Sequence, residues 1–135
     1  MSEQQVPVLA IILQSGELEK LHAGALVGSV AAMSGMKVNF FVTMNALENF
    51  LKTTVEQKKF TVGTVGQEML NKKIPLFYDL ILEGKELGEV QVYGCALAMD
   101  LVGWKIEDMV DGVFDDVIGV TAFLVMAQHA QVITM

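Results

Sequence analysis

Residues 7–35 read PVLAIILQSGELEKLHAGALVGSVAAMSG, and this stretch decides the fold class. Its first seven residues are a continuous apolar run, which is typical of a strand buried on both faces of a sheet. Residues 18–33 then place Leu18, Leu21 and Ala25 at roughly helical spacing, and Ser34-Gly35 is typical of a helix end. A buried strand that leads into a helix predicts a parallel βαβ arrangement with right-handed crossovers.

The same alternation continues along the chain. Further strands are expected at 38–43, 90–93, 112–114 and 132–134, and further helices at 46–52, 75–84, 99–102, 106–110 and 117–130. We therefore predict one α/β domain over residues 1–135, with a mostly parallel five-stranded sheet and helices on both faces, of the flavodoxin-like or Rossmann-like type. Residues 53–74 have a weak pattern with two glycines and are expected to form a mobile surface excursion or lid, with a helical turn or two, over the mouth beside Cys95.

Composition excludes several functional classes. Sixteen acids oppose nine bases, all of them lysine, for a net charge of −7, which argues against nucleic-acid binding. Hydrophobic residues make up 53% of the chain, so we expect a homo-oligomer that covers part of this apolar surface. The longest nearly apolar stretch, residues 117–127, contains Thr121 and is shorter than the roughly 20 residues of a membrane helix. We expect a cytoplasmic protein without stable membrane insertion.

Cys95 is the one cysteine and the first candidate for chemistry. It follows the third predicted strand, at the edge of the sheet where ligands bind in folds of this type, and stands just ahead of a helix. The positive end of a helix dipole stabilises a thiolate there, and Gly94 allows a sharp turn that leaves the sulfur accessible. The competing interpretation is a cysteine that simply packs in the core.

Other side chains could assist at this edge. His22 lies in the first turns of the first helix and could pair with Cys95, although a histidine without a catalytic duty is more common. Asp100 could face the thiol or cap a helix. Ser15 and Gly16, in the first strand-to-helix turn, could line the same pocket, but that turn matches no nucleotide-binding motif. No cofactor is expected, and the ligand spacings of a zinc site are absent.

The segment from Cys95 reads CALAMDLVGW and is followed by an acidic helix and Asp-Gly-Val. This resembles the DsrE-like family, and within it the subgroup with C-x-x-x-M-D-x-x-G after the third strand. The blocks LEKL at 18–21, AAMSGM at 31–36 and FFVT at 40–43, with Leu47 just beyond, resemble that subgroup in the same order. The resemblance spans nearly the whole chain except residues 53–74.

The resemblance implies a sulfur-transfer role. Similar proteins accept a sulfane sulfur or thiosulfonate on the matching cysteine, here Cys95, and pass it to a partner of the TusA-like or rhodanese-like type. Gly94 precedes that cysteine, and Met99, Asp100 and Gly103 match motif positions without an assigned role. The alternatives are a monothiol peroxidase and a non-catalytic assembly or small-ligand-binding domain in which Cys95 is incidental.

Overall fold

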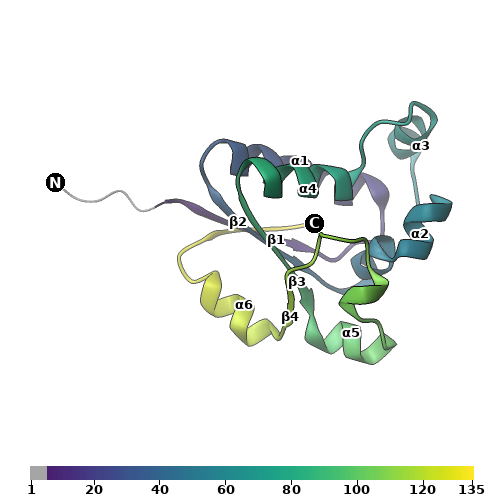
Figure 1. Cartoon of the computed structure of the whole chain (residues 1–135). Helices are drawn as coiled ribbons and strands as arrows, with labels where there is room; N and C mark the ends of the chain where they lie inside the picture. Colours follow the sequence, from purple (N-terminus) through teal and green to yellow (C-terminus); the bar gives the residue numbers. More distant parts are fainter. Residues whose placement is uncertain (1–5) are drawn as a thin grey trace.

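The computed structural model describes residues 6–135, along which strands and helices alternate (Figure 1). The elements follow in the order β1 (Val8–Leu13), α1 (Leu18–Met33), β2 (Lys37–Val42), the 3-10 helix η1 (Met44–Phe50), α2 (Lys52–Gln57), α3 (Thr64–Asn71), α4 (Phe77–Leu87), β3 (Glu89–Cys95), α5 (Ala96–Val102), the 3-10 helix η2 (Ile106–Asp108), β4 (Asp116–Ile118), α6 (Val120–Met126) and β5 (Gln131–Thr134). The predicted α/β class is confirmed.

All strand pairs in the sheet are parallel, and the strand order is β4-β3-β2-β1-β5. The register pairs Leu13 with Val42 on β1 and β2, and Val42 with Gly94 on β2 and β3. The carboxyl ends of the three central strands therefore meet at one edge of the sheet, and Cys95 lies at this edge.

The two faces of the sheet are covered unequally. The longer helices α1 and α4 lie over one face, and the short helices α5 and α6 lie over the other (Figure 1). Gly28 lets α1 approach closely, because a Cβ there would lie 2.3 Å from Cζ of the buried Phe40. On the other face, the rings of Phe41 and Phe123 stack at 4.6 Å and hold α6 on β2.

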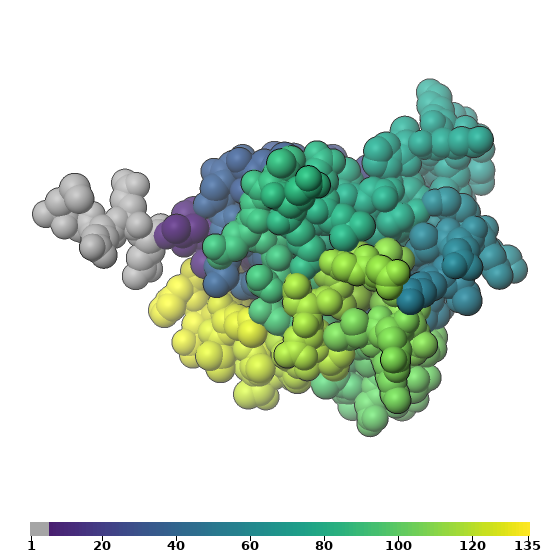
Figure 2. Space-filling model, viewed as in Figure 1, coloured from purple at the N-terminus to yellow at the C-terminus, as the bar shows by residue number. Residues whose placement is uncertain are grey.

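Residues 53–74 are more helical than the predicted turn or two, since they contain most of α2 and all of α3. They project at the end of the sheet where the strands finish (Figures 1 and 2). A carboxylate from α1 fixes the start of α3: Glu19 Oε2 accepts hydrogen bonds from the backbone N–H of Gly63 at 2.7 Å and of Gly66 at 2.9 Å. The pattern of residues 53–74 alone could not reveal this long-range cap.

Replacing Glu19 should loosen α3 selectively. The backbone N–H of Gly66, then that of Glu19 itself and that of Gly63, stabilise the Glu19 carboxylate and lower its pKa below the usual value. The stability that these hydrogen bonds add is therefore fully present above the ordinary pKa of glutamate. It is lost as the pH falls through the lowered pKa of Glu19. Hydrogen exchange measures the protection of the backbone amides of residues 61–71. Glu19→Ala should lower this protection more than Glu19→Gln does, because glutamine keeps a hydrogen-bond acceptor. Glu17→Ala should leave the protection of α3 unchanged. Equal protection of α3 in all three variants would contradict the role of Glu19.

Three local predictions near the ends of elements are wrong. Pro75 precedes α4 by two residues instead of starting it. The fourth strand is Asp116–Ile118 and not 112–114, because Val113 and Phe114 pack in the core as a loop. The last helix is only Val120–Met126, because the apolar run that starts at Val117 first completes β4 and then turns at Gly119.

Within residues 6–135, no helix combines the length and apolar character that crossing a bilayer requires.

Candidate functional site

Cys95 is the last residue of β3 and the N-cap residue of α5. Its backbone is extended, with φ −72° and ψ 115°, and the helix begins at Ala96. The predicted position of the thiol, at the carboxyl edge and directly ahead of a helix, is confirmed. The helix that follows the thiol is short, with seven residues, and the Cys95 side chain makes no cap hydrogen bond with it.

The expected accessibility of Cys95 is wrong for this conformation. The residue is 6% exposed and belongs to the hydrophobic core. The reason is that α5 folds back over the end of β3, where Ala98 and Met99 are also buried.

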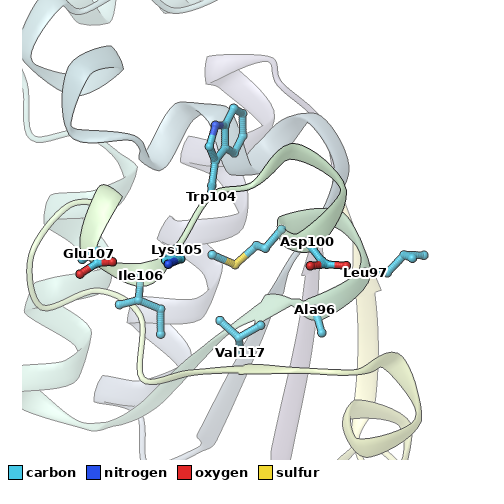
Figure 3. Close-up of a pocket in the computed structure, with 9 residues that line it drawn as sticks. Ala96, Leu97, Asp100, Trp104, Lys105, Ile106, Glu107 and Val117 are labelled. Atoms are coloured by element: carbon cyan, nitrogen blue, oxygen red, sulfur yellow. The ribbon is translucent and has the colours of Figure 1, made fainter.

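A cavity of about 1000 Å³ opens beside Cys95. Figure 3 shows Ala96, Leu97 and Asp100 of α5 on one side of the cavity and Lys105, Ile106 and Glu107 on the other. Trp104 stands at one end and Val117 of β4 at the opposite end (Figure 3). Cys95 itself does not line the cavity, whereas its neighbours Ala96 and Met99 do.

The lining of this cavity is mainly apolar, with one lysine and two carboxylates. Of these lining residues, the sequence motif indicates Met99 and Asp100 but none of the others. Trp104 is a signal in the sequence for this cavity, because it is the single tryptophan of the chain and places a large apolar side chain directly after the motif. Val117 could not be found without the correct position of β4.

Gly94 and Met99 are in direct contact at the base of the site. A Cβ on Gly94 would lie 2.4 Å from Met99 Sδ and 3.7 Å from the ring of Phe114. Met99 is 2% exposed, so its thioether packs against the bare backbone that precedes Cys95. The glycine and the methionine of the motif thus form one packing unit.

Gly94→Ala should destabilise the protein by about 1–2 kcal/mol, because the added methyl overlaps a methionine that can partly adapt. Gly119→Ala is the matched control, since no atom lies within 4 Å of its Cβ and its φ of −77° suits any residue. Chemical denaturation measures both changes. A Gly94→Ala protein as stable as the control would show that the Met99 contact is unimportant.

The two remaining motif residues, Gly103 and Asp100, lie at the end of α5 and inside it. Gly103 ends α5 with a φ of +74°, the left-handed region that favours glycine, so its role is to stop the helix. Asp100 lies inside α5, whose N-cap residue is Cys95 and whose C-cap residue is Gly103, so it does not cap this helix; it is exposed and lines the cavity.

A second hollow of about 260 Å³ lies between η1 and α5. Met44 lines it and has a φ of +50°, which is unusual for a bulky side chain. Leu97 and Leu101, one turn apart on α5, are exposed beside it, at 72% and 83%. The helix α5, which directly follows Cys95, therefore presents an apolar surface to the outside.

Ser15, Gly16 and His22 do not line either cavity. Ser15 Oγ accepts a hydrogen bond from Glu17 N, and Gly16 packs against Asn45 of η1. His22 is on α1, which covers the face opposite α5 (Figure 1). Its Nδ1 is buried without a hydrogen-bond partner, and burial lowers the pKa of the imidazole. The structure does not bring His22 to the Cys95 cavity.

Among residues 6–135, no three His, Cys, Asp or Glu side chains converge in a way that could hold a metal ion.

Comparisons with known proteins agree with this architecture. The model of the DsrE/DsrF/DrsH-like family matches residues 55–135. No curated protein matches the chain. Among solved structures, MTH1491 of Methanobacterium thermoautotrophicum, a protein of unknown function, is similar with a TM-score of 0.53 and 12% identity. The match covers 97% of this chain and 100% of that one, and at this identity it shows the fold alone.

Proposed function

Because the chain belongs to the DsrE/DsrF/DrsH-like family, we propose that it is a sulfur carrier or sulfurtransferase that works through Cys95. The observation that carries the proposal is the position of this single cysteine at the carboxyl edge of the sheet, between β3 and α5 and next to a large apolar cavity. Ligands of open parallel sheets bind at this edge.

The reaction needs no second cysteine. The Cys95 thiolate attacks a sulfane sulfur of the donor, and the S–S bond that joins this sulfur to the rest of the donor breaks. The rest of the donor leaves with the electron pair: a shorter polysulfide or thiolate from a polysulfide, sulfite from thiosulfate, and thiosulfate from tetrathionate, which is the donor that leaves a thiosulfonate group on Cys95. Cys95 then carries a persulfide or, from a thiosulfonate donor, the thiosulfonate group. An acceptor thiolate takes the terminal sulfur of the persulfide, and the Cys95 thiolate is released. The acceptor is a separate protein of the TusA-like or rhodanese-like type.

Loading requires a local opening at α5, since Cys95 is nearly covered. The helix is short, only Ala98 and Met99 of it are buried, and Leu97 and Leu101 face outward. Few apolar contacts thus hold it on the sheet, and segments of this kind open at low free-energy cost. A partner that covers the exposed leucines could bind the opened helix.

Sulfur loading tests the proposal. The intact protein is treated with polysulfide, thiosulfate or tetrathionate, and its mass is measured before and after addition of an acceptor thiol. We expect a mass increase from at least one donor and its loss on transfer. A mass that no donor changes would rule out the carrier function.

The burial of Cys95 favours a second candidate, a non-catalytic assembly domain in which the thiol is a core residue. The exposed apolar residues of α6 fit either function. Val120, Leu124 and Val125 are each more than half exposed, and only Phe123 of α6 is buried. We propose that a second copy of the chain covers this surface in a closed homo-oligomer.

Leu124→Glu should shift the protein towards monomers, because it places a charge in the apolar contact of α6. Gln128→Glu, an equal charge change just beyond α6, should leave assembly unchanged. Sedimentation velocity at micromolar concentration measures both. A wild-type protein that sediments as a monomer would contradict the assembly.

A further inference from the structure

A cavity of about 700 Å³ lies between residues 58–75 and α4 and shares no lining residue with the Cys95 cavity. Its volume is in the range of small-molecule sites, about 300–1,000 Å³. Most of its wall is apolar: Met69, Leu70, Ile74, Pro75 and Leu76. The cavity could therefore cover a hydrocarbon body, and its charged residues decide what else a ligand must carry.

Two lysines, Lys58 and Lys73, line this cavity, and both have a φ of +54°. Only three non-glycine residues among 6–135 have a positive φ, so two of the three lie at this one cavity. Both positions follow a helix, α2 or α3, where glycine is the residue that the backbone favours. The positive φ has a conformational cost for lysine that glycine would avoid. The presence of lysine at both positions therefore indicates a function of the two side chains.

The ammonium groups of these lysines are available to an anion. Lys58 Nζ lies 2.5 Å from the Tyr78 hydroxyl and 5.3 Å from the centre of its ring, which positions the charge. No carboxylate of the described chain is within ion-pair distance of either lysine. On the α4 side, the carboxylates of Asp79 and Glu83 also line the cavity; Asp79 accepts a hydrogen bond from Leu76 N at 3.0 Å, and Glu83 is exposed.

We propose that this cavity binds a small amphipathic acid. The carboxylate or sulfonate of the ligand meets Lys58 and Lys73, and its hydrocarbon body packs on Met69, Leu70 and Ile74. A bound acid would contact both residues 58–75 and α4, and so it would hold these two parts together. This binding is independent of sulfur chemistry, because none of these residues belongs to the Cys95 site.

Calorimetric titration of the whole chain with octanoate, octylamine and octanol tests the proposal. We expect saturable binding of one octanoate, and binding of the amine and the alcohol at least tenfold weaker. Equal or tighter binding of the amine or the alcohol, or no saturable binding of octanoate, would overturn the proposal.

Variants of the lysines assign the binding to this cavity. Lys73→Gly should weaken octanoate binding about tenfold while the thermal unfolding temperature stays equal or rises, since glycine suits a φ of +54°. Lys73→Gln should weaken binding equally, and Lys59→Gln, one residue from the cavity lining, should not. Cys95→Ser should bind octanoate as the wild type does. Affinity that neither Lys73 variant changes would refute the site.

Discussion

Cys95→Ser is expected to abolish sulfur loading completely while the protein remains folded. The chain contains no other cysteine, so no second thiol can accept sulfur in its place. The exchange of sulfur for oxygen is small, and the Cys95 side chain makes no cap hydrogen bond on α5 that would be lost. Intact mass after donor treatment measures the loading, and denaturation and sedimentation check fold and assembly.

Two outcomes would contradict this expectation. A mass increase that persists in Cys95→Ser would show that sulfur is added elsewhere on the chain. Unfolding of Cys95→Ser would show that Cys95 is mainly a packing residue, and Cys95→Ala, which lacks the hydroxyl, would then be compared. If Cys95→Ala is folded but unloaded while the wild type is loaded, the chemical role stands.

Gly28→Ala should destabilise the protein more than Gly94→Ala does. Helix propensity alone favours alanine by about 1 kcal/mol. The new methyl, however, would lie 2.3 Å from Phe40 Cζ and 3.1 Å from Ile11 Cδ1, and both side chains are fully buried. Overpacking of this kind costs about 3 kcal/mol, so a net loss of about 2 kcal/mol is expected. Urea denaturation measures the free energy of unfolding.

A double-mutant cycle provides the control for Gly28→Ala. Phe40→Leu removes the ring carbons that the new methyl would meet, so the double variant should lose less stability than the sum of the single variants. Additive losses would show that contact with Phe40 does not fix the distance between α1 and the sheet.

The fold could be predicted from sequence wherever a segment has a single periodicity. The run 7–13 and the helix 18–33 were placed within one residue, because strand and helix there are separated by a polar turn. The run from Val117 failed for the opposite reason. It is nearly apolar along its length, yet the chain uses it first for the end of β4 and then for α6, and Gly119 marks the change.

The candidate site was predicted in position but not in exposure. The end of a parallel strand follows from the order of elements, so Cys95 could be placed at the edge of the sheet. Whether α5 lies over the thiol depends on the packing of Met99 against Gly94, which no local pattern encodes. The position of Lys105, Ile106 and Glu107 in the cavity wall could not be predicted either, because tertiary contacts bring them opposite α5.

The thiol-alkylation rate of the folded wild-type protein tests the central claim most directly. Iodoacetamide labelling is followed by intact mass without denaturant and at several denaturant concentrations below the unfolding transition. If Cys95 is reactive through local opening of α5, labelling proceeds without denaturant, and its rate hardly depends on denaturant at low concentration. If labelling occurs only as the whole protein unfolds, Cys95 is a core residue and the sulfur-carrier function is wrong.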